Sequence, residues 1–196
     1  MSIIGTLLGS KAKSKEQQIL QQFGRGDDSA MDLLYTEYAS LLTGVCARYI
    51  PGDDDRKDVL QESLVKAYLQ MGTFSYRGPG SLKAWLVRIV INESLRFLHK
   101  KTAEQTVSLD SLVAEPADKA VDDPGVNGVP DDALAGMIAS LPEGYRQVFN
   151  LFAIDGKSHK EIAALLGIKP DTSASQYYKA KKMLARMIKD YQKKDK

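Results

Sequence analysis

The stretch FSYRGPGSLKAWLVRIVIN, residues 74–92, joins an irregular loop to a run with helical periodicity. Within that run stands Trp85, the only tryptophan of the chain. A row of aromatic, basic and amide side chains recurs there at helical spacing: Trp85, Arg88, Asn92, Arg96 and His99, with Lys100 and Lys101 behind them. Bases stack on aromatic faces and cations hold phosphates, so this edge predicts a nucleic-acid contact. A core position for Trp85 stays open as the alternative, because tryptophan is highly buried on average.

The loop in front of this helix, from Phe74 to Ser81, contains two aromatic residues, an arginine and Gly-Pro-Gly. Glycine lets backbone donors come close to a ligand, and an unstacked base is read in a pocket. The loop is therefore a candidate pocket for one extruded base. Ser81 is predicted to cap the next helix, whose buried face is predicted to consist of Leu82, Leu86, Ile89, Val90 and Phe97.

A second candidate site lies near the C-terminus, in KSHKEIAALLGIKPDTSASQYYKAKKMLARMI. With Ala163 in a first helix and Gly167 in a turn, it has the layout of a helix-turn-helix. The second helix is predicted to pack through Tyr177, Ala180, Leu184 and Ile188, and to point Thr172, Ser175, Gln176 and Lys179 outward. Such polar side chains suit duplex base edges. The alternative is a helical hairpin with a solvated basic face.

Two capping boxes are predicted to open helices in this C-terminal part, one from Ser140 to Glu143 and one from Ser158 to Glu161. The basic residues of the final helix would add attraction to phosphates that does not depend on DNA sequence: Lys181, Lys182, Arg186 and Lys189.

An acidic helix is predicted from about residue 54 to 71. Its buried face is predicted to hold Leu60, Leu64, Ala67 and Met71. Its opposite face holds Asp55, Asp58, Glu62 and Val65, with Gln61 near the edge of that face. An acidic face with an apolar residue at its centre is typical either of an ordinary wet surface or of a docking face for a basic partner. The preceding helix, which Pro51-Gly52 ends, carries an apolar stripe of Leu34, Tyr38, Leu41, Leu42, Val45 and Tyr49.

Residues 102–132 separate the two candidate sites. This segment is rich in Asp, Glu and Pro, shows no sustained periodicity, and has Lys119 as its single base. It predicts a flexible acidic linker. We therefore expect an all-α chain of two small helical domains: an unassigned segment (1–14), a first domain (15–101), the linker (102–132), a second domain (133–190) and a basic tail (191–196).

Composition narrows the class of protein. The 196 residues are 43% hydrophobic and 27% charged with a net charge of +2, which suits a soluble globular protein. The single Cys46 excludes a disulfide framework and fits a reducing compartment. No apolar stretch approaches a membrane span or a secretory signal, so a cytoplasmic protein without membrane insertion is expected.

In order and spacing, these motifs resemble the extracytoplasmic-function (ECF) sigma factors of bacterial RNA polymerase, of the sigma-70 family. The resemblance covers about residues 25–190. The first domain contributes LLYTEYASLL, DDRKDVLQESLVKAY and FSYRGPGSLKAWLVRIVINESLRFLHKK. The second contributes LPEGYRQVFNLFAIDGKSHKEIAALLGI and DTSASQYYKAKKML. The resemblance implies a region 2 helical bundle, a region 4 helix-turn-helix, and transcription initiation at promoters with two elements.

The resemblance also implies residue roles. Asp55, Asp58, Gln61, Glu62 and Val65 would dock on the clamp helices of the polymerase's largest subunit. The melted −10 element would meet Phe74, Tyr76, Arg77, Gly78, Ser81, Lys83, Trp85, Arg88, Asn92, Arg96, His99, Lys100 and Lys101. The duplex −35 element would meet Thr172, Ser175, Gln176, Tyr178, Lys179 and Lys182. Ser173 stands where the family is usually apolar, and Tyr177 where it usually has leucine. An anti-sigma protein is a partner that family members commonly have.

Two other classes of protein fit the sequence less well. A stand-alone helix-turn-helix regulator would use the second domain but would need neither the acidic helix nor the glycine loop, and it would normally dimerise. An enzyme is not expected, because His99 and His159 are the only histidines and no metal-ligand spacing, P-loop or nucleophile motif occurs. Neither a metal nor a cofactor is expected.

Overall fold

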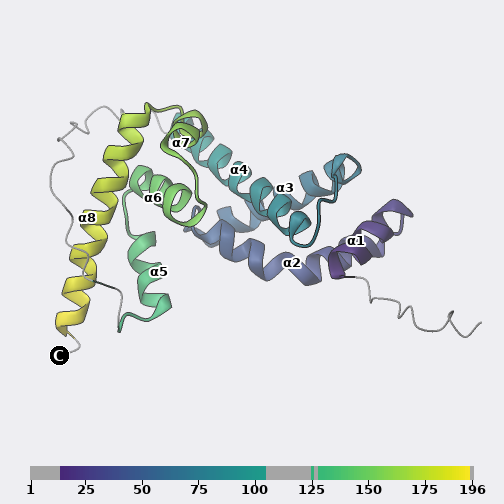
Figure 1. Cartoon of the computed structure of the whole chain (residues 1–196), viewed down its shortest axis with the longest axis horizontal. Helices are drawn as coiled ribbons and strands as arrows, with labels where there is room; N and C mark the ends of the chain where they lie inside the picture. The colour runs from purple at the N-terminus through teal and green to yellow at the C-terminus, as the bar shows by residue number, and fades with distance from the viewer. Residues whose placement is uncertain (1–13, 105–124, 126–127, 195–196) are drawn as a thin grey trace, which may run out of the picture.

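The computed structural model describes residues 14–104, 125 and 128–194, and within them every regular element is helical (Figure 1). The first group comprises α1 (Lys15–Gly24), α2 (Ser29–Ala47), α3 (Asp53–Gln70), the short η2 (Met71–Thr73) and α4 (Ser81–Glu104). The second comprises α5 (Asp131–Ala139), α6 (Glu143–Phe149), the π-helical turn η3 (Asn150–Ile154), α7 (His159–Leu166) and α8 (Pro170–Lys194). The all-α prediction is confirmed. Most of the predicted acidic linker lies outside the described residues, and α4 and α5 extend into its two ends.

The first group is a bundle around α2 and α4, and its core follows the predicted stripes with two exceptions. Leu34, Tyr38 and Leu42 are buried on α2, but Leu41 is exposed because it lies at the edge of the stripe. On α3 half of the predicted buried face is confirmed, because Ala67 is buried, as is Met71 at the start of η2. Val59 and Ser63 are buried beside them, whereas Leu60 and Leu64 are only partly covered.

Helix α4 buries more of its surface than predicted. Leu82, Leu86, Ile89 and Val90 are buried as expected, Phe97 is half-buried, and further buried positions are Ile91, Glu93, Ser94, Leu95 and Leu98. Cys46 of α2 is fully buried against Ser94, and burial raises the pKa of its thiol. A buried thiol of raised pKa is a packing group rather than a nucleophile.

Local signals explain several helix ends, though not all as predicted. The Ser158 capping box forms, with Glu161 accepting the Ser158 N–H at 2.8 Å, and these hydrogen bonds lower the pKa of Glu161. The box expected at Ser140 does not form. Pro142 precedes α6, and the Ser140 hydroxyl instead donates to Met137 O at the end of α5. An unpredicted capping box, Ser14 with Gln17, opens α1.

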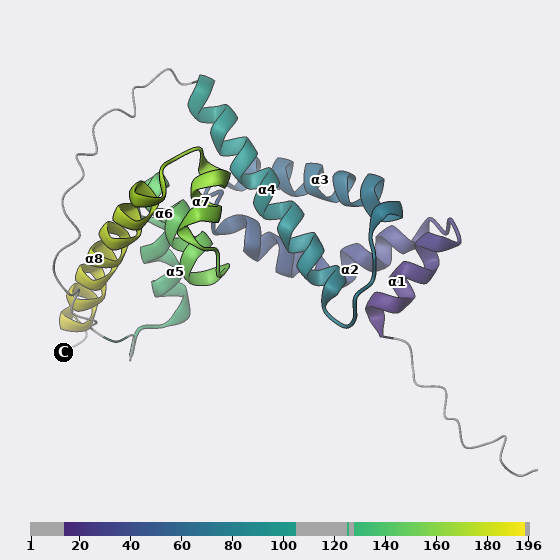
Figure 2. The ribbon, with the colours of Figure 1, turned by 45° about the horizontal axis from the view of Figure 1, so that its top comes forward.

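The two helical groups pack against each other at the C-terminal end of α2 (Figure 2). Asp155, placed by η3, accepts hydrogen bonds from Arg48 Nη2 at 3.0 Å and from the Tyr49 hydroxyl. Asn150 Nδ2 donates to Arg48 O at 2.8 Å. Burial, and then the Asp155 charge, raise the pKa of Tyr49, so its hydroxyl stays a donor. Sequence periodicity gave no signal for this contact, because its partners lie far apart in the chain.

Replacing Asp155 with alanine is expected to loosen the two groups. The substitution leaves the Tyr49 hydroxyl and the partly buried Arg48 guanidinium without their acceptor, at a cost of about 1–3 kcal/mol. Small-angle scattering of the free chain should report a larger radius of gyration. Asp190→Ala, which removes an exposed acid of α8, is the control. An unchanged radius in the Asp155 variant would mean that apolar packing alone holds the groups together.

Candidate nucleic-acid interface

The loop between η2 and α4 has a backbone that needs its glycines. Gly78 and Gly80 adopt φ values of 124° and 85°, which side chains other than glycine rarely tolerate. Ser81 is the first residue of α4 rather than its N-cap. Its hydroxyl donates to Gly78 O at 2.7 Å and accepts the N–H of Arg77 at 3.2 Å. Ser81 therefore closes the loop on itself.

A cavity of about 320 Å³ lies between this loop and the first turns of α4. Its walls combine aromatic, hydroxyl and basic side chains: Thr73, Phe74, Ser75, Arg77, Ser81, Ala84, Trp85 and Arg88. Phe74 and Trp85 contact each other, with ring centroids 5.1 Å apart and planes tilted by 50°. Both alternatives for Trp85 are partly realised, because the side chain packs on Phe74 and also lines the cavity. Such a cavity offers both an aromatic surface and cations to a base with its phosphate.

The predicted row continues along α4 as an exposed strip. Arg88, Asn92, Arg96 and His99 are all exposed, as are Lys100 and Lys101 beyond them. The packing of the two helical groups leaves this strip open. Lys83 and Tyr76 are also exposed. The structure thus brings Trp85, Arg88, Asn92, Arg96 and His99 onto one edge of α4. Tyr76 instead lines a separate cavity with Phe23 and Tyr68, and Lys83, two residues before Trp85, points to another side of the helix.

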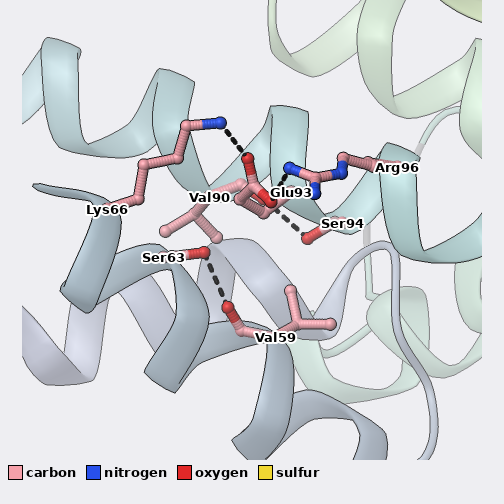
Figure 3. A network of polar contacts seen from close by, with 7 residues as sticks. All are labelled: Val59, Ser63, Lys66, Val90, Glu93, Ser94 and Arg96. Carbon is pink, nitrogen blue, oxygen red and sulfur yellow. Dashed lines mark hydrogen bonds and ion pairs between the residues drawn. The ribbon is translucent and has the colours of Figure 1, made fainter.

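Two acids contact this strip. The sequence assigned no role to the first, Glu93, and predicted the second, Asp55, for the docking face. Glu93 is 5% exposed and forms an ion pair with Lys66 of α3. Its Oε2 also accepts a hydrogen bond from Arg96 Nη1 at 3.2 Å (Figure 3). Asp55, predicted for the docking face, lies 2.6 Å from Lys101 Nζ. The burial of Glu93 could not be predicted, because an acid between helical residues usually carries a solvated charge. Only the packing of α3 against α4 places it beside Lys66.

The predicted docking face on α3 is exposed beside a hollow of about 560 Å³ between α3 and α4. Asp58, Gln61, Glu62 and Val65 line this hollow. The predicted Val65 is 53% exposed, and two apolar side chains that were not predicted are exposed nearby on α3, Tyr68 at 55% and Leu69 at 74%. Asp55 is the predicted member that stands apart, because it contacts Lys101. An acidic rim with exposed apolar side chains suits a partner surface that is both basic and apolar.

In the second group, α7 and α8 form the predicted helix-turn-helix, with Gly167 at φ 67° ending α7. Ala180, Leu184 and Ile188 are buried as expected. Tyr177 is partly buried beside Phe152, with ring centroids 4.4 Å apart. Burial raises the pKa of Tyr177.

Ser173 and Tyr177, two positions at which the resemblance leads one to expect aliphatic residues, lie in one cluster. Ser173 is fully buried, and its hydroxyl lies 2.9 Å from His159 Nδ1. The His159 ring stacks on Phe152 at 4.4 Å with an interplanar angle of 13°. Tyr177 covers the same Phe152 ring. A polar contact and stacked rings therefore fix the start of α8 on α7.

The predicted −35 residues do not all face solvent equally. Thr172 and Lys182 are exposed, whereas Ser175, Tyr178 and Lys179 are partly covered. Gln176 turns toward α6, where its amide would lie 3.5 Å from a Cβ added at Gly144. Gln176 is therefore partly covered by α6, whereas Thr172 and Lys182 are open to solvent.

Comparison with known proteins matches both helical groups. Residues 34–104 match the family model described as Sigma-70 region 2, and residues 131–184 match Sigma-70, region 4. The chain is 30% identical over 179 residues to the ECF RNA polymerase sigma-E factor of Salmonella typhimurium, covering 86% of this chain and 92% of that protein. It is 27% identical to the RNA polymerase sigma-H factor of Pseudomonas aeruginosa, covering 90% and 95%.

A solved structure shares the fold. The sigma factor RpoE from Bartonella quintana, co-crystallised with the anti-sigma factor NepR, superposes with a TM-score of 0.50 at 22% identity, covering 82% of this chain and 98% of that one.

None of the described helices is long and apolar enough to cross a membrane. Within the described ranges, no group of three His, Cys, Asp or Glu residues is arranged to hold a metal ion.

Proposed function

The chain belongs to the ECF sigma factors of the sigma-70 family, and on that basis we propose that its two surfaces divide promoter recognition between them. It is an RNA polymerase sigma factor. In the proposed division, the loop and strip of α4 read the melted −10 element, and the exposed start of α8 reads the −35 element as duplex. The observation that carries the proposal is the aromatic and basic cavity beside the glycine loop.

The −10 role assigns one extruded base to the cavity. Phe74 and Trp85 supply the stacking surface, while Arg77 and Arg88 neutralise the phosphates on either side. Asn92 lies farther along the strip and reads upstream bases, and Arg96, His99, Lys100 and Lys101 hold the backbone. Phosphate contacts set the register, and the cavity supplies the choice of base.

Docking on polymerase is assigned to the α3 face. Asp58 and Glu62 meet basic residues of the clamp helices, and Val65 is covered by them. The same docking is proposed to break the contact of Asp55 with Lys101 and so free that lysine for the promoter strand. An anti-sigma protein is a further proposed partner, since the Bartonella quintana sigma factor was crystallised with one.

The experiment that tests this function is reconstitution with core polymerase. The purified chain should co-elute with sigma-free core, and the complex should initiate on a promoter library at one shared two-part sequence. The chain without core polymerase should not initiate transcription. Failure to bind core, with retention of duplex DNA by a dimer of the chain, would instead favour a stand-alone helix-turn-helix regulator.

Lys182→Ala should weaken binding of the isolated duplex −35 site about equally for all sequences. The exposed ammonium is assigned to a phosphate, so its loss should make the negative slope of log K against log salt shallower by about 0.9. Titration at several salt concentrations measures that slope. Lys193→Ala, near the far end of α8, is the control and should leave it unchanged. Equal slopes in all three proteins would remove Lys182 from the DNA surface.

A further inference from the structure

One buried carboxylate joins the N-terminal helix to the loop that precedes α4. Glu16, in the first turn of α1, is 7% exposed. Its Oε2 accepts the N–H of Gly80 at 2.9 Å, and its Oε1 accepts the N–H of Lys83 at 3.2 Å. The Tyr38 hydroxyl of α2 donates to Oε1 at 3.3 Å. Three elements therefore meet at this one side chain.

Glu16 does for α4 what an N-cap residue does for most helices. Helix N-termini leave backbone N–H groups without partners, and a side chain at the N-cap normally accepts the third of them. The residue before α4 is Gly80, which has no side chain to accept it. Glu16 accepts the Lys83 N–H instead, from another helix. Its negative charge also suits the positive end of the helix dipole.

The same carboxylate restrains the loop itself. Gly80 has a left-handed φ of 85°, and its N–H points to Glu16 Oε2 at 2.9 Å. Next to it, Ser81 fixes Gly78 and Arg77 through its hydroxyl. The position of Arg77 on the cavity wall therefore depends on a chain of hydrogen bonds that begins at α1.

We propose that Glu16 is a positioning residue for −10 recognition, which holds the loop from Phe74 to Ser81 in the shape that receives an extruded base. The inference rests on the proposed function of that loop. It assigns a role to α1, a helix that lies outside both matched family regions.

Glu16→Gln is the informative variant, because it keeps the size of the side chain but places an amide –NH₂ where an oxygen accepted a backbone N–H. Glu16→Asp keeps the charge with a shorter reach. Tyr38→Phe is the matched control, since it removes the third hydrogen bond to Glu16 without touching the loop. Burial and the Glu16 charge raise the pKa of Tyr38, so its hydroxyl is a donor and its loss is a clean deletion.

Four measurements separate positioning from general stability. Holoenzyme affinity for a single-stranded −10 oligonucleotide reports the cavity, and the emission of Trp85, the sole tryptophan, reports the loop in the free chain. Co-elution with core and binding of duplex −35 DNA report the rest of the molecule. In Glu16→Gln we expect about a tenfold loss of single-strand affinity and altered Trp85 emission, with core and duplex binding unchanged. Glu16→Asp should recover part of the loss, and Tyr38→Phe should stay within about twofold of wild type.

Two results would overturn the proposal. Unchanged single-strand affinity and emission in Glu16→Gln would mean that the loop holds its shape without Glu16. A parallel loss of single-strand, core and duplex binding would make Glu16 a residue of the general fold. If wild-type holoenzyme itself fails to bind the −10 strand, the proposed function of the loop fails, while the Trp85 emission still decides whether Glu16 sets the loop's conformation.

Discussion

A chain carrying Asp58→Arg and Glu62→Arg is expected to lose co-elution with core RNA polymerase. Both side chains are exposed at the hollow beside α3, so neither substitution removes a buried contact. Each reverses a charge that the proposed function places against basic clamp helices. Like charges brought together at an interface cost several kcal/mol, so the affinity for core should fall by about a thousandfold or more.

The control for that variant carries the same change of net charge on the other domain. Asp131→Arg with Asp132→Arg alters two exposed acids in the first turn of α5. It should retain core binding, and both double variants should keep the helical circular dichroism of the parent. Retained core binding by the Asp58 and Glu62 variant would place the docking face elsewhere on the bundle. Equal loss in both double variants would reduce the effect to net charge.

Hydrophobic period predicted the helices and most of their buried faces. It located the stripe of Leu34, Tyr38 and Leu42 on α2 and that of Ala180 and Leu184 on α8. It misjudged α3, where Val59 and Ser63 are buried and Leu60 and Leu64 only partly so. A helix with apolar residues on two sides has no single preferred inward face, and the packing of α2 and α4 decides which one is covered.

The polar residues of the site divide according to the range of their partners. The glycines of the loop and the exposed strip of α4 depend on local chemistry, so residue types and helical spacing were enough to predict them. Glu16, Glu93 and Asp155 were not predicted, because each acts on an element far away in the chain. Gln176 shows the converse. Its type suits a base edge, but its amide lies beside Gly144 of α6, a neighbour that sequence periodicity does not reveal.

Trp85→Ala is expected to weaken the binding of single-stranded −10 DNA by the holoenzyme by about 1–3 kcal/mol, or roughly five- to 150-fold. That range is the usual cost of removing one aromatic side chain on which a base stacks. The expectation rests on the place of Trp85 at the cavity wall beside Phe74 and Arg88. Trp85→Phe keeps an aromatic face and should restore most of the affinity. Fluorescence of 2-aminopurine at the extruded position would report the loss of stacking directly.

The half-buried state of Trp85 requires a control for packing, and Val87 provides it. Val87 is also half-buried on α4 but lies on a different side of the helix from the strip. If Trp85 acts through stacking, Trp85→Ala lowers single-strand affinity far more than Val87→Ala does for a similar fall in melting temperature. If Trp85 serves only the core, the two variants lose affinity in proportion to their loss of stability. In that case the cavity beside the glycine loop needs a different stacking partner, and Phe74 is the aromatic residue left on its wall.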